Sequence, residues 1–150
     1  NNSSYATLLS MGAAGSILGA LLAKKLFQNS HTSLLLSLAL SGMGLALITP
    51  LALLGLPAFI ISTGNLIFEC FLTIFNIHFF SMVQKKVPNE LLGRVFSSIF
   101  TVAVIFMPLA TGLMAAPPFS VHILTFAILG LAILLMSGLA FLYSRLNLNE

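Results

Sequence analysis

The strongest constraint in the sequence is the absence of charge from two long stretches, residues 26–68 and 95–144. Each stretch is longer than the roughly 20 apolar residues that a helix needs to cross a bilayer, so each must hold more than one span. Only 6% of the residues are charged and 59% are hydrophobic, whereas a soluble domain carries about 25% charged residues. Because so little charge cannot cover the surface of a soluble fold, the sequence predicts an integral membrane protein.

Proline, glycine and polar residues divide the chain into five predicted spans. Pro57 suits the first turn of a helix, and Pro88 ends one because it lacks an amide hydrogen. The second span either runs to residue 54 or stops already at Thr49. The predicted fold class is all-α: a polytopic transmembrane helix bundle that forms a single domain, with spans at about 6–27, 33–54, 58–84, 95–115 and 121–144 and polar connections at 28–32 and 85–94.

The basic residues follow only the first, third and fifth spans, and they are Lys24, Lys25, Lys85, Lys86, Arg94 and Arg145. The connections after the second and fourth spans carry no charge. Lysine and arginine are enriched in cytoplasmic connections of membrane proteins. We therefore expect a multi-pass protein of the cell (plasma) membrane, with the N-terminus of this chain outside, its C-terminus in the cytoplasm, and connections 28–32 and 85–94 cytoplasmic.

Glu69 is the only charged residue that the predicted topology places within the hydrocarbon core of the membrane. An ionised residue in mid-helix costs about 2.5–3.5 kcal/mol on insertion scales, so it faces the bundle interior or a water-filled cavity. Four polar residues lie within about 40° of Glu69 on a helical wheel, and His78 lies on the opposite side. We call the resulting set the polar stripe, and it consists of Ser62, Asn65, Glu69, Thr73 and Asn76.

Two interpretations of the polar stripe stay open from the sequence. In the functional interpretation, the stripe lines a solute path, and Glu69 binds a proton or a cationic substrate. Within the hydrocarbon core, the predicted spans offer no lysine or arginine to pair with this carboxyl. In the structural interpretation, a protonated Glu69 forms a hydrogen bond with Asn65 or Thr73 and helps to hold helices together.

The sequence lacks the patterns of common catalytic and metal sites, since it contains no HExxH, GxSxG or GxxxxGK[ST]. His31, His78 and His122 fall at three different places in the predicted topology, which argues against a metal site. The single cysteine, Cys70, cannot form an intramolecular disulfide. The few basic residues are too dispersed to follow a phosphate backbone. We expect no enzyme activity, no cofactor, no metal and no nucleic-acid partner.

Small residues gather on one face of the first span, namely Gly12, Gly15, Ser16, Gly19, Ala20 and Ala23. Such faces let two helix backbones approach closely within lipid, and Gly15 and Gly19 form a GxxxG pattern. Pro108, followed by Gly112, lies inside the fourth span and predicts a kink there. That kink is either a gating element or a tolerated irregularity.

We call the connection 85–94 between the third and fourth predicted spans the charged connection. It lies within the pattern QxxVPxELxGRV over residues 84–95. This pattern resembles the loop between helices 10 and 11 of major facilitator superfamily transporters, especially the macrolide-efflux and enterobactin-exporter-like branch. Residues 6–26 are similar to helix 8 of that family, and the Met107-Pro108-Leu109 sequence with Gly112 is similar to the middle of helix 11. One departure is that residues 24–31 lack the acidic residue often found in the family's loop between helices 8 and 9.

The resemblance implies helices 8 to 12 of such a transporter, an incomplete C-terminal half of the fold, and the absence of an initiator methionine agrees with a fragment. It implies secondary active, proton-coupled efflux of a small molecule or drug by alternating access. The implied partners are the lipid bilayer, the missing N-terminal helices, the substrate and the proton.

Within the charged connection, the resemblance implies that Pro88, Glu90, Gly93 and Arg94 form a cytoplasmic latch between helices. A plain solvated turn with topology-determining lysines is the alternative for these residues. For the chain as a whole, the alternative function is a non-transporting membrane interaction or assembly module.

Overall fold

The computed structural model describes residues 2–26, 31–115 and 123–147, and these residues form five α-helices. The helices are α1 (Asn2–Leu22), α2 (His31–Leu53), α3 (Ala58–Lys86), α4 (Asn89–Ala115) and α5 (Ile123–Asn147). Each helix is long and apolar enough to cross a membrane. The prediction of an all-α fold with five apolar spans is therefore confirmed. The predicted connection 28–32 is described only from His31 onward, and the predicted start of the last span at residue 121 lies outside the described residues.

The charged connection is more helical than the sequence predicts. Lys85 and Lys86 form the last turn of α3, and Glu90 lies in the first turn of α4. Only Val87 and Pro88 separate the two helices. Val87 has φ −100° and ψ 130°, the extended backbone that a residue before proline prefers. The polar stretch 85–94 is therefore mostly helix, because both helices continue beyond the apolar part of their spans.

The turn between α2 and α3 depends on Gly55 and Pro57. Helix α2 continues past Thr49 and Pro50 before it ends at Leu53. Gly55 has φ 67°, a left-handed conformation that glycine adopts without strain. Pro57 has φ −55° and occupies the N-cap position of α3, so its fixed φ directs the chain into the helix. The turn thus lies where the sequence predicts it.

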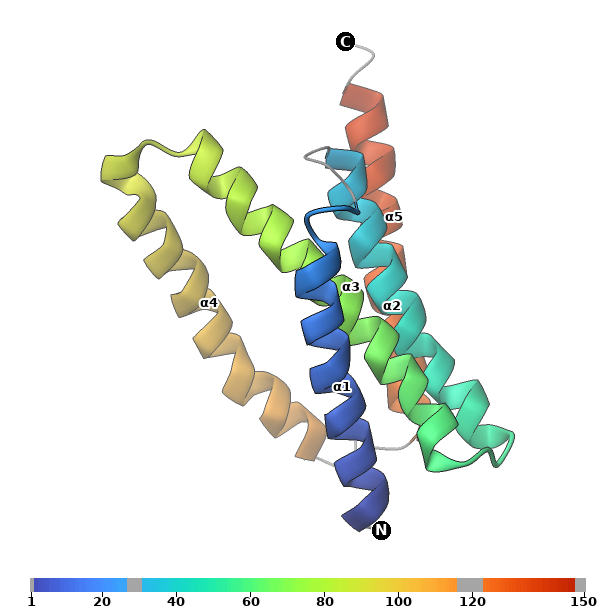
Figure 1. Cartoon of the computed structure of the whole chain (residues 1–150). Helices are drawn as coiled ribbons and strands as arrows, with labels where there is room; N and C mark the ends of the chain where they lie inside the picture. Colours follow the sequence, from blue (N-terminus) through green and yellow to red (C-terminus); the bar gives the residue numbers. More distant parts are fainter. Residues whose placement is uncertain (1, 27–30, 116–122, 148–150) are drawn as a thin grey trace.

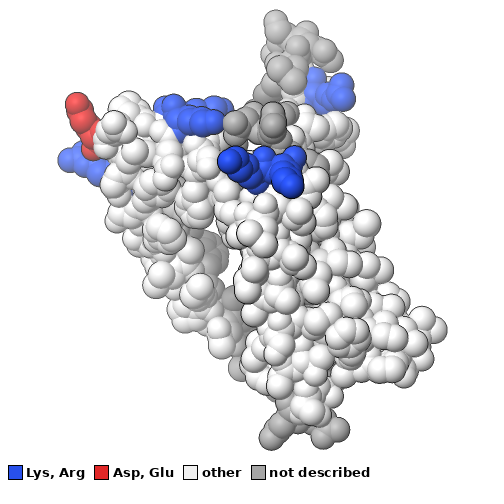
Figure 2. Space-filling view, in the orientation of Figure 1, with Lys and Arg blue, Asp and Glu red and all other residues white. Residues whose placement is uncertain are grey.

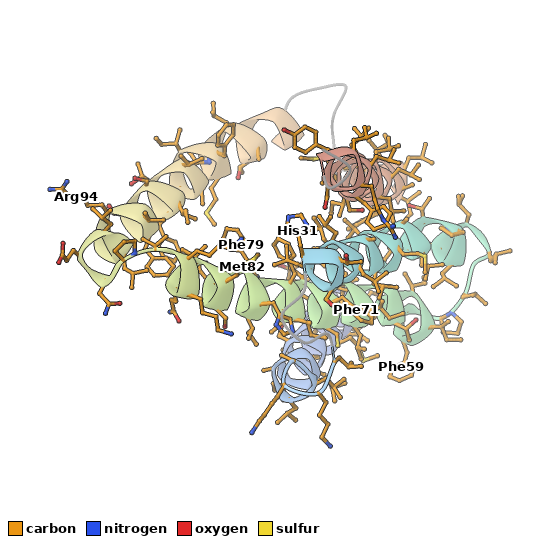
Figure 3. The ribbon with its side chains drawn as sticks, turned by 90° about the horizontal axis from the view of Figure 1, so that it is seen from above. His31, Phe59, Phe71, Phe79, Met82 and Arg94 are labelled. Carbon is orange, nitrogen blue, oxygen red and sulfur yellow. The ribbon has the colours of Figure 1, made fainter. Side chains whose placement is uncertain are left out.

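Four of the helices pack in the order α1, α3, α2, α5, and α4 stands apart from this row (Figure 1). Viewed from above, α1 lies on one side of α3, whereas α4 and α5 lie on the other side (Figure 3). Helix α4 meets the end of α3 through the ring of Phe80, which lies 5.7 Å from the ring of Phe96 and 5.9 Å from that of Phe100. From residue 100 to residue 112, every side chain of α4 is exposed.

Glycine forms the contact between α1 and α3. A Cβ atom at Gly15 would collide with the carbonyl oxygen of Leu66, and one at Gly19 would collide with the carbonyl oxygen of Cys70. A backbone oxygen cannot move aside as a flexible side chain can. The two helices therefore approach this closely only because the facing positions of α1 are glycine, and these are the two glycines of the GxxxG pattern.

Glycine also forms both contacts of α2. Toward α3, a Cβ at Gly64 would lie 2.7 Å from Cγ1 of Ile48 and 2.8 Å from the carbonyl oxygen of Gly44. Toward α5, a Cβ at Gly130 would lie 2.7 Å from the carbonyl oxygen of Gly42. The row of four helices is thus joined at each step by close backbone contact, which is how helices associate in lipid, where no hydrophobic force drives them together.

Candidate functional site

The polar stripe of α3 lies largely against α1. The Oγ of Ser16 donates a hydrogen bond of 3.0 Å to Oε2 of Glu69. The Nδ2 of Asn65 donates a hydrogen bond of 2.9 Å to the carbonyl oxygen of Leu8. Both bonds join the two helices near the glycine contacts. The structure therefore brings the two most polar members of the stripe to one helix–helix contact, which we call the α1·α3 polar contact.

The other three members of the stripe have different surroundings. Thr73 faces α1, because its Cβ would lie 3.0 Å from a Cβ at Gly19. Ser62 is buried, and its hydroxyl donates a hydrogen bond of 2.7 Å to the carbonyl oxygen of Ala58 in its own helix. Asn76 is exposed. The stripe is therefore not a single site, and only Asn65 and Glu69 donate to or accept from α1.

Gly12 makes room for the α1·α3 polar contact. A Cβ at Gly12 would lie 2.6 Å from Nδ2 of Asn65 and 3.4 Å from Cγ of Glu69. Any larger residue would push the amide away from Leu8. The sequence places Gly12 and Ser16 on the small-residue face but gives them no role toward Glu69. The available signal is their spacing of four residues, which puts them one above the other on the same face of α1.

The hydrogen bond from Ser16 suits both protonation states of Glu69. The hydroxyl donates, and a carboxyl oxygen accepts whether or not the group carries a proton. Glu69 is half-buried, and one hydroxyl leaves most of its acceptor capacity unused. The structural interpretation expected Asn65 or Thr73 as its partner, whereas the structure shows Ser16. The α1·α3 polar contact can thus persist while a proton binds to or leaves Glu69.

The basic side chains gather at one end of the molecule (Figure 2). Helices α1 and α3 end there, with Lys85 and Lys86 in the last turn of α3. Arg145 lies in the last turn of α5, and Arg94 near the start of α4. This end is the one that the charge pattern predicts to face the cytoplasm. Glu69 lies in the middle of α3, away from these cations.

The residues of the predicted latch lie at the connection between α3 and α4, away from the helices that pack on α3. Pro88, Glu90, Gly93 and Arg94 are all exposed, and Arg94 points away from the bundle (Figure 3). A Cβ at Gly93 would meet no atom within 4 Å. The latch that the resemblance implies therefore has no partner helix beside Gly93 in the described part of the chain.

The predicted kink lies in α4, and the described histidines lie in α2 and α3. Helix α4 continues through Pro108, and a Cβ at Gly112 would meet no atom within 4 Å. His31 begins α2 and His78 lies in α3, while His122 lies outside the described residues. Among the described residues, no group of three His, Cys, Asp or Glu side chains could hold a metal ion.

Replacing Ser16 with alanine is expected to destabilise the bundle by about 0.6 kcal/mol, the average value for a hydrogen bond between membrane helices. The loss is small because Glu69 is only half-buried. Thermal unfolding in dodecyl maltoside can be followed by a thiol-reactive dye, since Cys70 is the single cysteine and is buried. The matched control is Ser98→Ala, because the Ser98 hydroxyl is exposed and bonds within its own helix. Equal unfolding temperatures for the two variants would contradict the role of Ser16.

Comparison of the chain with known protein families, with curated proteins and with solved structures found no match. The resemblance to the major facilitator superfamily therefore rests on the sequence motifs alone.

Proposed function

We propose that this chain is part of a secondary active transporter of the cell membrane, in which Glu69 binds the coupling proton. The observation that carries the proposal is a carboxyl in the middle of an apolar helix, bonded to Ser16 of the neighbouring helix. Ionisable residues at such depth are costly, and those that occur usually belong to proton relays or solute paths. The resemblance to the major facilitator superfamily points to the same class, with efflux of a small molecule or drug.

Competition at Glu69 would couple the proton to the solute. A protonated carboxyl is neutral and can remain at the α1·α3 polar contact without a counter-ion. An ionised carboxyl requires water or a cation beside it, because its charge is poorly solvated at this depth. Binding of a proton and binding of a cationic solute at Glu69 would therefore exclude each other. Mutual exclusion of two ligands is the condition for exchanging one against the other across a membrane.

The exposure of α4 supports a role within a larger bundle. Every side chain from residue 100 to residue 112 is exposed, and the ring contacts of α4 with α3 lie near the beginning of α4. In the proposed transporter, part of this surface is covered by the N-terminal helices, and the rest faces lipid. Under this proposal the solute path lies between the two sets of helices, so the 150 residues alone do not transport.

The proposal can be tested with proteoliposomes that contain the transporter with its N-terminal helices and enclose a pH-sensitive dye. Ethidium, tetraphenylphosphonium and rhodamine 6G serve as probe cations. We expect at least one of them to drive proton movement in the opposite direction, and a protonophore should abolish the signal. Liposomes without protein are the control. If none of the three probes moves protons, the proposal of a proton-coupled exporter of cations is wrong.

The second candidate function is a non-transporting membrane interaction or assembly module. It is favoured by the use of both Asn65 and Glu69 in bonds to α1, as a purely structural role would require. In that case the exposed surface of α4 binds other membrane proteins, and Glu69 only holds helices together. The two functions differ in the effect of removing the proton site while keeping the hydrogen bond.

A further inference from the structure

A pocket of about 400 Å³ lies between the end of α1 and the last turns of α3. Its lining includes Ala20 and Lys24 from the α1 side and Ile77, Ser81 and Lys85 from α3. None of these residues belongs to the polar stripe, and none takes part in the α1·α3 polar contact. Lys24 belongs to the turn after α1 and Lys85 to the last turn of α3, and both line the pocket. The basic side chains gather at one end of the molecule (Figure 2).

The pocket changes from apolar to basic along the helices. Ala20 lies one turn deeper in the membrane-spanning part than Lys24, and Ile77 lies about two turns deeper than Lys85. Ser81 lies between these levels on α3. The pocket therefore offers carbon atoms and the imidazole of His78 at its deeper end, a hydroxyl in the middle, and two lysines at its outer end. No acidic residue lines it.

His78 holds the two walls of the pocket together. Its Nε2 lies 3.2 Å from the carbonyl oxygen of Leu26, in the turn that follows α1. Because a carbonyl oxygen only accepts, this contact requires the proton on Nε2. The imidazole thus fastens the turn after α1, which carries Lys24, to the helix that carries Lys85.

We propose that this pocket binds the headgroup of an anionic phospholipid. The phosphate lies between Lys24 and Lys85 and accepts a hydrogen bond from Ser81, and the glycerol and upper acyl carbons lie against Ala20 and Ile77. Basic pockets between membrane helices on the cytoplasmic side bind such headgroups. The apolar deeper wall favours a lipid over a soluble phosphate, and the two positive charges favour an anionic over a zwitterionic lipid.

A bound lipid would join α1 to α3 at the basic end of these two helices, beyond the α1·α3 polar contact that contains Glu69. It would add a bridge between the helices beyond the glycine contacts at Gly15 and Gly19. The inference does not depend on transport, because an assembly module with the same α1 and α3 would bind the lipid equally well.

The test is native mass spectrometry of the purified chain in detergent, titrated with phosphatidylglycerol or with phosphatidylcholine of the same acyl chains. We expect tighter binding of phosphatidylglycerol. The double variant Lys24→Gln/Lys85→Gln should weaken it by about fivefold for each lysine. The matched control is Lys25→Gln/Lys86→Gln, which removes the same charge from exposed positions outside the pocket lining, and it should change the affinity much less.

Three results would overturn the proposal: equal affinity for the two lipids, equal weakening in the two double variants, or displacement of phosphatidylglycerol by millimolar glycerol 1-phosphate. The last result would identify a site for soluble phosphates. Acetylation of lysines in the unmodified chain provides a readout that needs no variant to fold. Phosphatidylglycerol should protect Lys24 and Lys85 more than Lys25 and Lys86, and uniform protection of the four lysines would contradict the pocket.

Discussion

The substitution Gly64→Leu is expected to separate α2 from α3, which would divide the row of packed helices into the pairs α1·α3 and α2·α5. The packing order is α1, α3, α2, α5, so the contact between α3 and α2 is the middle step of the row. If it is lost, α1 stays with α3 and α5 stays with α2. Other single contacts would release only one helix at an end of the row. This substitution therefore has the largest structural effect that we predict.

The effect follows from what a side chain at Gly64 would meet. A Cβ there would lie 2.8 Å from the carbonyl oxygen of Gly44, and a Cβ at Gly44 would lie 2.6 Å from the backbone nitrogen of Phe68. Ile48 could change its rotamer, but the backbone of α2 cannot. Overpacking typically costs about 1–3 kcal/mol, and here the separation also removes the van der Waals packing that holds membrane helices together. We expect a total loss above about 3 kcal/mol.

The measurement is the temperature at which Cys70 reacts with a thiol-reactive dye in dodecyl maltoside. Cys70 is buried on α3 and packs with Ala23 of the turn after α1, so it reacts when the α1·α3 pair opens, and that pair should open at a lower temperature once α2 no longer packs against it. Gly138→Leu is the matched control, because it makes the same change within α5 at a position where a Cβ would meet no atom within 4 Å. The Gly64 variant should expose Cys70 at a much lower temperature. Similar temperatures for the two variants would show that the glycine contact does not hold the bundle together.

The helices and their turns were predictable because few sequence signals compete in an apolar chain. Charge is absent from the middle of the spans except at Glu69, and proline marks two of the turns, at Pro57 and at Pro88. A helix in lipid must satisfy its own backbone hydrogen bonds, so an apolar segment of this length has only one regular structure available. The helix ends at the charged connection were less predictable, since a helix can continue into water for a turn or more.

The packing partners were not predictable from hydropathy. In water, an apolar face indicates the side that packs, but in lipid the outer face of a helix is apolar as well. Helix α2 shows the consequence. Gly42 faces α5 and Gly44 faces α3, although both glycines lie in the same apolar segment of the sequence. The sequence also gives no reason why α4 stands apart, since its apolar side chains resemble those of its neighbours.

The candidate site was predicted only in part. Helical periodicity correctly places Asn65 and Glu69 on one face of α3, because the two residues are four positions apart. It does not indicate which helix they face. Ser16, which donates to Glu69, is 53 residues away in the sequence. Only the packing of α1 on α3 brings the two side chains together. The choice between the functional and the structural interpretation therefore depends on experiment.

Replacing Glu69 with glutamine is expected to abolish proton-coupled transport and to leave the α1·α3 polar contact intact. The glutamine side chain has nearly the same shape, and its carbonyl oxygen can accept the hydrogen bond from Ser16. It cannot bind and release a proton in the accessible pH range. In the proteoliposomes described above, proton movement driven by the probe cations should fall to the level of liposomes without protein, at every pH at which the unmodified protein is active.

Ser16→Ala is the matched control for this experiment, because it removes the hydrogen bond and keeps the carboxyl. It should lower the unfolding temperature slightly and retain coupled proton movement, whereas Glu69→Gln should show the reverse pattern. If Glu69→Gln transports with unchanged rate and pH dependence, Glu69 is not the proton site. If it leaves both transport and stability unchanged, the functional interpretation is wrong and the structural one stands, because glutamine keeps the hydrogen bond from Ser16. Because the two variants separate the proton from the hydrogen bond, together they decide whether this carboxyl serves chemistry or helix packing.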